Sequence, residues 1–175
     1  LCGTSCNMKE IKRLADMYDI RIIEDASHAI GGSYQGIPIG SCRHSEVTVF
    51  SFHPVKIITS GEGGMATTND PRIAEKMEDL RSHGITKNRS RFEVSEAGPW
   101  AYEQQSLGFN YRMTDIHAAL GISQMKRLDE ITQERNKLLE NYEKLLNKLP
   151  LKLLQIPKEC YSSVHLAVIR LMDKD

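Results

Sequence analysis

The sequence predicts an α/β protein in which a mostly parallel sheet is flanked by helices. Segments with apolar residues at helical spacing alternate along the chain with short segments rich in β-branched residues, such as 47–52. Polar residues follow these strand-like segments, as in open α/β sheets, whose ligands bind at the carboxyl ends of the strands. The composition, 40% hydrophobic and 26% charged, is that of an ordinary globular domain.

The first part of the chain is expected to form a helix, a hairpin and three strands. Asn7 and Glu10 have the spacing of a capping box, so a helix should begin there and carry apolar residues as far as Tyr18. The glycine-rich segment 31–40 predicts a hairpin or loop. Strands are expected at 21–23, where the apolar run indicates burial, and at 47–52 and 64–68.

The middle of the chain combines a helix with a long irregular segment. Asp70 before Pro71 is typical of a helix start, and Gly84 is expected at the position directly after the C-cap. Residues 85–113 show no clear period, and a segment of this length is commonly functional. Its aromatic side chains indicate that it docks on the protein. A helical region follows over 115–149.

The end of the chain predicts a change of structure. A break in the long helical region is expected near Gly121 or Lys126. Residues 164–171 predict a final strand that opens a second, smaller α/β domain. Because the chain begins at Leu1 and stops just after this strand, we interpret it as an internal fragment of a longer protein.

Composition and charge exclude several classes of function. Lys plus Arg number 23 and Asp plus Glu number 23, so no basic excess is present for binding nucleic acid. No apolar run approaches the roughly 18 residues of a membrane helix and no signal peptide is recognisable, which favours a cytoplasmic protein without a membrane partner. The four cysteines lack CxxC and Cys/His spacing, so we expect reduced thiols and no bound metal.

Lys56 stands just past a strand-like segment and before the glycine-rich turn 61–64. Its apolar neighbours Val55, Ile57 and Ile58 could remove water from the amine. Desolvation lowers the pKa of an ammonium group and exposes a nucleophile that can form an imine with an aldehyde. A surface lysine beside a turn is the alternative that the residues leave open.

Asp25 follows the strand predicted at 21–23, at its carboxyl end. A carboxylate at this place can pair with a protonated pyridine nitrogen, and the protonated ring is a strong electron acceptor for a carbanion. An N-cap or a surface acid is the alternative. Asp25 and Lys56 together motivate the hypothesis of chemistry on a pyridine aldehyde.

An ordered series of motifs runs through nearly the whole chain. It comprises 23–31 (IEDASHAIG), 50–56 (FSFHPVK), 61–65 (GEGGM), 68–70 (TND), 80–84 (LRSHG), 108–115 (GFNYRMTD) and 118–121 (AALG). In this order and spacing the series resembles the DegT/DnrJ/StrS family of sugar-nucleotide aminotransferases, which use pyridoxal phosphate (PLP) on fold type I. The variant at 52–56, with Ser27 and His28, is most similar to the branch that acts on UDP-4-keto-6-deoxy-N-acetylhexosamines and forms a pseudaminic acid precursor, UDP-4-amino-4,6-dideoxy-N-acetyl-β-L-altrosamine.

The resemblance implies a PLP-dependent aminotransferase that moves an amino group from L-glutamate to a UDP-linked 4-keto-6-deoxy-N-acetylhexosamine. It also implies a cytoplasmic homodimer with shared active sites. It divides the chain into 1–125, the C-terminal part of the large PLP-binding domain, and 126–175, a linking helix with the start of a truncated small domain. We expect the fragment alone to be inactive.

The resemblance assigns roles to residues at matching positions. Lys56 matches the lysine that bonds covalently to PLP and moves the proton, and Asp25 matches the partner of the pyridine nitrogen. His28 matches a position near the phenolic oxygen of the ring, and Ser51 matches a serine that meets the phosphate. Asn110 matches an asparagine that reaches the phosphate in the neighbouring subunit.

Three further residues are candidates for substrate contact. They are Tyr111, Arg112 and His165, of which the last resembles a small-domain histidine that faces the site. A strand histidine without a catalytic role is the alternative for His165. For the whole protein, the alternative is a regulator or binding protein that keeps the PLP fold without catalysis, and the intact lysine and aspartate count against it.

Overall fold

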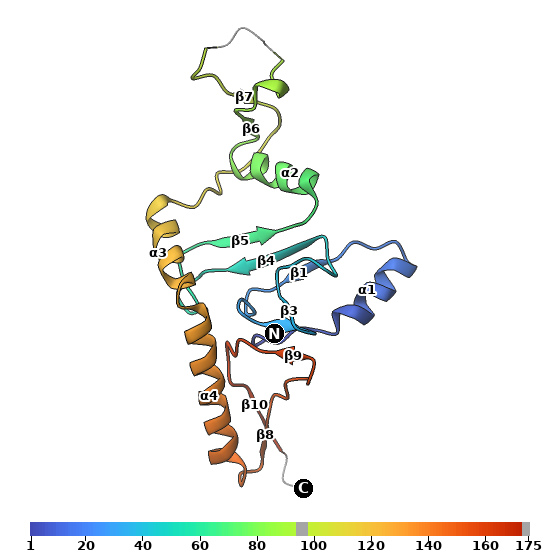
Figure 1. The fold of residues 1–175 in the computed structure, drawn as a ribbon, viewed down its shortest axis with the longest axis vertical. Helices are drawn as coiled ribbons and strands as arrows, with labels where there is room; N and C mark the ends of the chain where they lie inside the picture. The colour runs from blue at the N-terminus through green and yellow to red at the C-terminus, as the bar shows by residue number, and fades with distance from the viewer. Residues whose placement is uncertain (94–97, 173–175) are drawn as a thin grey trace. The chain divides into compact units, whose positions relative to one another are not determined.

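The computed structural model describes residues 1–93 and 98–172 (Figure 1). The chain divides into two compact units. The first unit comprises Leu1–Asn69 and Asp115–Asp175, and the second comprises Asp70–Thr114. The first unit carries a three-stranded sheet, and the second carries a helix followed by a short strand pair.

Three strands lie side by side in the first unit, in the order β1–β4–β5 (Figure 1). They are β1 (Ile23–Asp25), β4 (Val47–Ser51) and β5 (Gly64–Thr67). β1 pairs with β4 in parallel, with Asp25 opposite Val49, whereas β4 and β5 are antiparallel. Asp25 and Ser51 therefore end their strands at the same edge of the sheet.

The predicted α/β class is present, but the sheet is not mostly parallel as predicted. Among the strand pairings of the described residues, β1–β4 is parallel and the others are antiparallel. Parallel neighbours need a crossover connection, usually a helix. Residues 52–63 join β4 to β5 through turns, with no helix among them, so the chain reverses direction.

The first strand lies two residues later than predicted, and its start is not buried. β1 begins at Ile23, whose side chain is 69% exposed, instead of covering 21–23. The pairing explains the shift, because the Ile22 N–H donates to the Glu46 carboxylate at 2.6 Å and the ladder begins one residue later, with Ile23 opposite Val47.

The predicted glycine-rich hairpin is confirmed. β2 (Ser33–Tyr34) and β3 (Ile37–Pro38) pair antiparallel around Gln35 and Gly36, whose φ angles are 50° and 75°. Two successive positive φ angles match a two-residue type I′ hairpin turn. β9 (Cys160–Tyr161) pairs with the other side of β2, so a segment near the C-terminus completes this small sheet.

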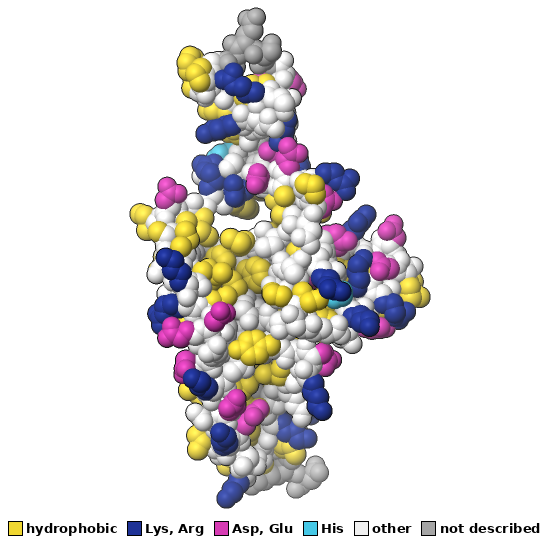
Figure 2. Space-filling view, in the orientation of Figure 1, with side chains coloured by type: hydrophobic (Ala, Val, Ile, Leu, Met, Phe, Trp, Pro, Cys, Tyr) yellow, Lys and Arg dark blue, Asp and Glu magenta, His cyan; other side chains and the backbone are white. Residues whose placement is uncertain are grey.

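The helices of the first unit begin and break at predicted positions. α1 (Met8–Met17) follows Asn7, whose side chain accepts a hydrogen bond from a first-turn N–H at 3.2 Å. α3 (Asp115–Met125) and α4 (Leu128–Leu146) are separated at Lys126. Figure 2 shows charges of both signs along α4, and hydrophobic side chains gathered over the sheet and α3.

The strand predicted over 164–171 is wrong in its first half. β10 (Ile169–Leu171) pairs antiparallel with β8 (Leu151–Leu153), whereas residues 164–168 form no strand and the first two of them are buried. Val164 has a φ of 48°, which interrupts an extended strand, and the His165 N–H donates to the Cys2 carbonyl at 3.0 Å. A contact with a distant segment therefore overrides the β-propensity of this stretch.

α2 (Pro71–Arg81) opens the second unit, and Asp70 is its N-cap as predicted, accepting from the Arg72 N–H at 2.8 Å. The helix ends one residue earlier than predicted, because His83 already has a φ of 61° and Gly84 follows with 69°. Short elements lie where an irregular segment was expected: β6 (Ile85–Thr86), η1 (Arg89–Arg91) and β7 (Glu103–Gln104), with β6 and β7 antiparallel.

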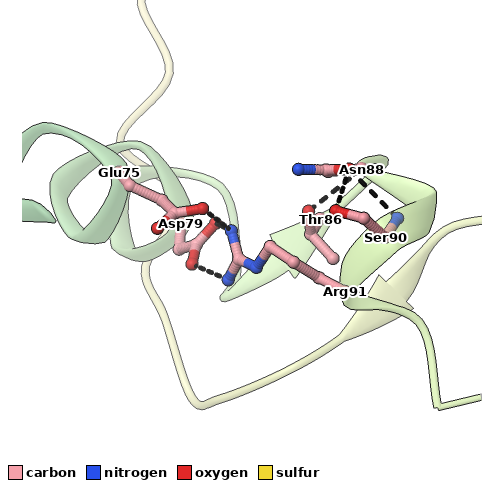
Figure 3. Close-up of polar contacts among 6 residues, drawn as sticks. All are labelled: Glu75, Asp79, Thr86, Asn88, Ser90 and Arg91. Atoms are coloured by element: carbon pink, nitrogen blue, oxygen red, sulfur yellow. Dashed lines mark hydrogen bonds and ion pairs between the residues drawn. The ribbon is translucent and has the colours of Figure 1, made fainter. Parts of the chain in front are cut away.

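Ion pairs tie η1 to α2 (Figure 3). The Arg91 guanidinium donates to Glu75 at 2.9 Å and to both carboxylate oxygens of the buried Asp79. The segment is attached to α2 by these ion pairs and by backbone hydrogen bonds such as that from the Phe109 N–H to the Leu80 carbonyl at 2.6 Å. Its aromatic residues Trp100 and Tyr111 contribute little to this contact, since they are 82% and 71% exposed. Residues 94–97 of the same segment lie outside the described residues.

Candidate functional site

The parallel pairing of β1 and β4 places Asp25 and Ser51 at one edge of the sheet, as expected from the sequence. The chain stays attached to β4 beyond Asp25, because the Ala26 N–H donates to the Val49 carbonyl at 2.8 Å. Ser51 Oγ accepts a long hydrogen bond from the His53 N–H at 3.5 Å. The turn that carries the candidate lysine starts directly after this strand.

Ser27 provides two donors to the carboxylate of Asp25. Oδ1 of Asp25 accepts from Ser27 Oγ at 2.6 Å and from the Ser27 N–H at 3.0 Å. These bonds hold the pKa of Asp25 below its ordinary value, and the positive charge of Lys56 acts in the same direction. The exposed carboxylate is therefore ionised at neutral pH, so it can hold a proton on the ring nitrogen of a ligand.

Lys56 lies in a tight turn that follows β4. Its N–H donates to the His53 carbonyl at 3.0 Å. Ile57 and Ile58 are buried, but Val55 is 62% exposed, so the apolar surroundings predicted for the amine are only partly formed. Within the described residues, the Lys56 ammonium forms no hydrogen bond or ion pair.

The charge of Lys56 reaches three other candidate residues. It lowers the pKa of Asp25, of His28 and of His165, each after larger local causes. Charge interactions near a protein surface fade over a distance on the order of 10 Å at ordinary ionic strength. The charge of Lys56 therefore acts on residues from separate segments of the first unit.

His28 and His165 form a packed imidazole pair in this region. Their ring centroids are 4.3 Å apart and their planes are inclined by 52°. Burial lowers the pKa of both, that of His165 to about 4, and the positive charges of Lys56 and Arg135 add to the effect on His165. Both rings are therefore neutral at pH 7. His165 is 8% exposed and lies outside the strands.

Asn110, Tyr111 and Arg112 lie in the second unit, next to the end of α2. Ser82 and Asn110 form an isolated antiparallel bridge, and the Tyr111 N–H donates to the Arg81 carbonyl at 2.9 Å. All three candidate side chains are exposed. The other candidate residues lie in the first unit, so the structure does not bring all eight together within one unit.

Sequence reasoning missed the residues that hold the imidazole pair. The Cys2 N–H donates to His28 Nδ1 at 3.4 Å, and Arg135 Nη1 donates to the His165 carbonyl at 3.3 Å. The partners are 26 and 30 residues apart in the chain, so no local motif signals either contact. The fold alone brings these groups together.

A cavity of about 430 Å³ in the first unit is lined by Asp25, Ser27 and His28 together with apolar residues of α1 and β1. Lys56 is not among the residues that line it. Over residues 1–93 and 98–172, no group of three or more His, Cys, Asp or Glu side chains forms a potential metal site. No helix in these ranges has both the length and the apolar surface that a bilayer crossing requires.

Known proteins resemble this chain in sequence and in fold. Residues 1–175 match the model of the DegT/DnrJ/EryC1/StrS aminotransferase family. A UDP-4-amino-4,6-dideoxy-N-acetyl-beta-L-altrosamine transaminase from Campylobacter jejuni is 42% identical over 146 residues, which are 83% of this chain and 36% of the relative. The chain thus spans about a third of that relative's length.

Solved structures agree with the fold type I architecture that the motifs implied. Helicobacter pylori PseC, an aminotransferase involved in the biosynthesis of pseudoaminic acid, matches with a TM-score of 0.87 and 32% identity, over 97% of this chain and 43% of that chain. A putative sugar aminotransferase from Streptococcus pneumoniae in its PLP-form matches with a TM-score of 0.79 and 27% identity, over 98% and 46%. The chain therefore belongs to the DegT/DnrJ/EryC1/StrS aminotransferase family.

Proposed function

We propose that the full-length protein is a PLP-dependent aminotransferase that moves an amino group from L-glutamate to a UDP-linked 4-keto-6-deoxy-N-acetylhexosamine. The reaction would belong to the biosynthesis of pseudaminic acid-type nucleotide sugars. The observation that carries the proposal is the position of Asp25 and Ser51 at the carboxyl ends of a parallel strand pair, with Lys56 in the turn that follows this edge. The activities named for the Campylobacter and Helicobacter relatives support this choice of substrate.

The residues of the first unit fit PLP. Asp25 is ionised and exposed, so we assign it to the pyridine nitrogen. We assign Lys56 to the covalent bond with the aldehyde carbon, His28 to the phenolic oxygen and Ser51 to the phosphate. When bound, PLP supplies an acceptor for the electron pair left at the α-carbon of the amino donor.

The side chains divide the acid–base work between them. Asp25 keeps a proton on the ring nitrogen, because a carboxylate stabilised by two Ser27 donors does not take that proton up near neutral pH. Lys56 takes the proton from the α-carbon of the donor and later returns a proton on the sugar side, as base and then as acid. His28 is neutral and offers an N–H to the phenolic oxygen.

We also propose that the full-length protein is a cytoplasmic homodimer with shared active sites. Asn110 would reach the phosphate in the neighbouring subunit, and Tyr111 and Arg112 would contact the substrate there. Exposed apolar side chains in the same unit support an interface, since Leu107 is 89% exposed and Tyr111 is 71% exposed. His165 would approach the substrate from the first unit.

The domain organisation belongs to the same proposal. Residues 1–125 would be the C-terminal part of the large PLP-binding domain, and 126–175 would be a linking helix and the start of the truncated small domain. The chain spans 36% of the Campylobacter relative, so we expect the 175 residues alone to be inactive.

Covalent trapping of PLP tests the proposed function. The full-length protein should show the visible absorbance of bound PLP, and borohydride should fix the cofactor to Lys56, as located by peptide mass spectrometry. Lys56→Ala should abolish the label, whereas the exposed control Lys76→Ala on α2 should retain it. A label on another lysine would end the assignment of Lys56.

The response to an amino donor separates an enzyme from a binding protein. Addition of L-glutamate alone should bleach the visible band, because the amino group is then transferred to the cofactor. A band that responds to no amino donor would favour the non-catalytic regulator.

A further inference from the structure

The segment 162–165 is buried although it is polar and lies outside the helices and strands. Ser162 is 2% exposed, Ser163 is fully buried, and Val164 and His165 are 7% and 8% exposed. The positive φ of Val164 turns the chain inward at this point. Burial of irregular polar backbone requires partners for its N–H and carbonyl groups, and these partners come from two distant parts of the first unit.

The N-terminal residues provide the first set of partners. The Ser163 N–H donates to the Gly3 carbonyl at 3.2 Å, and the His165 N–H donates to the Cys2 carbonyl at 3.0 Å. Cys2 also donates its own N–H to His28 Nδ1 at 3.4 Å. One peptide segment therefore contacts both members of the imidazole pair.

α4 provides the second set. Arg135 Nη1 donates to the carbonyls of Val164 and His165, at 3.2 and 3.3 Å. Asn136 Nδ2 donates to the Ser162 carbonyl at 2.9 Å. Arg135 is partly buried and, among the described residues, has no recorded carboxylate partner. In the described residues, the hydrogen bonds of the Arg135 side chain thus go to the backbone carbonyls of Val164 and His165.

We propose that Arg135 is a positioning residue for the candidate site, which holds His165 against His28 and thereby orients His28. This inference rests on the proposed function, because His28 affects catalysis only if PLP binds beside it. A neutral imidazole that accepts a hydrogen bond at Nδ1 carries its proton on Nε2. The Cys2 contact therefore makes Nε2 the donor of His28, and the packed His165 ring restricts how far His28 can rotate.

Histidine labelling in the full-length protein tests the contact without reference to activity. Diethyl pyrocarbonate labels accessible imidazoles, and mass spectrometry reports each histidine separately. His165 should be labelled about tenfold faster in Arg135→Met than in the wild type. Loss of about 1.4 kcal/mol of hydrogen-bond energy raises the equilibrium constant for opening of the segment 162–165 tenfold. His53, whose side chain is 47% exposed, should be labelled equally in both proteins.

Two variants on α4 separate positioning from a general loss of folding. Lys137→Met removes a cation that pairs with Glu134 on the surface, and it should leave labelling and activity unchanged. Arg135→Lys keeps the charge and one possible donor to the carbonyls, so its labelling rate should fall between those of the wild type and Arg135→Met. If Arg135→Met does not fold, Arg135→Lys still decides the question.

The spectrum and kinetics of the loaded enzyme then test the orientation of His28. Arg135→Met should shift the absorbance maximum of bound PLP and lower kcat more than it raises KM for L-glutamate. Labelling of His165 at the wild-type rate in both folded Arg135 variants would overturn the proposal, as would faster labelling with an unchanged spectrum and kcat. A wild-type protein that binds no PLP would instead overturn the proposed function, while the labelling rates would still report whether Arg135 holds the pair.

Discussion

Substitution of Gly3 by alanine should loosen the contact between the N-terminal segment and residues 162–165. Gly3 has a φ of +94°, and a Cβ there would lie 2.7 Å from both Ser163 Oγ and Val164 N. A positive φ costs a non-glycine residue about 1–2 kcal/mol. Relief of steric contacts in a packed region costs about 1–3 kcal/mol more. We therefore expect about 3 kcal/mol of local destabilisation in Gly3→Ala.

Gly36 offers a matched control, because its φ is +75° but nothing lies within 4 Å of the position of a Cβ. Gly36→Ala should carry the backbone cost alone and should not affect residues 162–165. Hydrogen exchange at the amides of Ser163 and His165 in the full-length protein should be on the order of 100-fold faster in Gly3→Ala, and nearly unchanged in Gly36→Ala. Equal exchange at these amides in the wild type and both variants would refute the reasoning.

Three further predictions concern the full-length protein. Asp25→Asn should lower kcat by about 10²–10⁴-fold in a folded enzyme, and wild-type turnover would contradict its assignment to the ring nitrogen. Because folding lowers the pKa of His165 from 6.5 to about 4, the stability that it contributes is present above pH 6.5 and is lost as the pH falls toward 4. As the pH falls over that interval, the melting temperature of His165→Gln should therefore decrease less than that of the wild type. An equal decrease in both proteins would argue against this explanation. Heterodimers that combine a Lys56→Ala subunit with an Asn110→Ala subunit should regain part of the activity. If verified heterodimers show no activity, each active site is built within one chain.

Features that depend on neighbouring residues were predictable from the sequence. Asn7 and Asp70 cap their helices because a short polar side chain reaches a first-turn N–H wherever such a helix starts. The turn at Gln35 and Gly36 follows from glycine punctuation. The break at Lys126 was also expected, although the sequence offered Gly121 as a second position.

Features that depend on distant partners were not predictable in the same way. The start of β1 is set by Glu46, which takes the N–H of Ile22, and the hydrophobicity of 21–23 gives no sign of this contact. The strand predicted from 164 fails because Cys2 and Gly3 bind the backbone of this segment more than 150 residues away. β-propensity reports how well side chains fit a sheet, and it does not report which backbone partners are present.

The residues of the candidate site also divide into those predictable from neighbouring residues and those that depend on distant partners. The resemblance assigned site roles to Asp25, Ser51 and Lys56 directly from the sequence. These residues stand at or just beyond the ends of strands that have sequence signals. Arg135 stands on a charged helix among many similar residues, and its role depends on the carbonyls that the fold brings to it. A motif search finds residues that act on a ligand, whereas residues that position them are visible only through their contacts.

Burial of the imidazole pair also determines the charge of the candidate site. At neutral pH His28 and His165 are uncharged, because burial lowers the pKa of both. If 162–165 moved away, water would reach both rings and their pKa values would rise toward 6.5. A positive charge would then appear on the imidazoles as the pH falls through that range. The buried segment therefore keeps the charge of the candidate site constant over the pH range in which an exposed histidine pair would titrate.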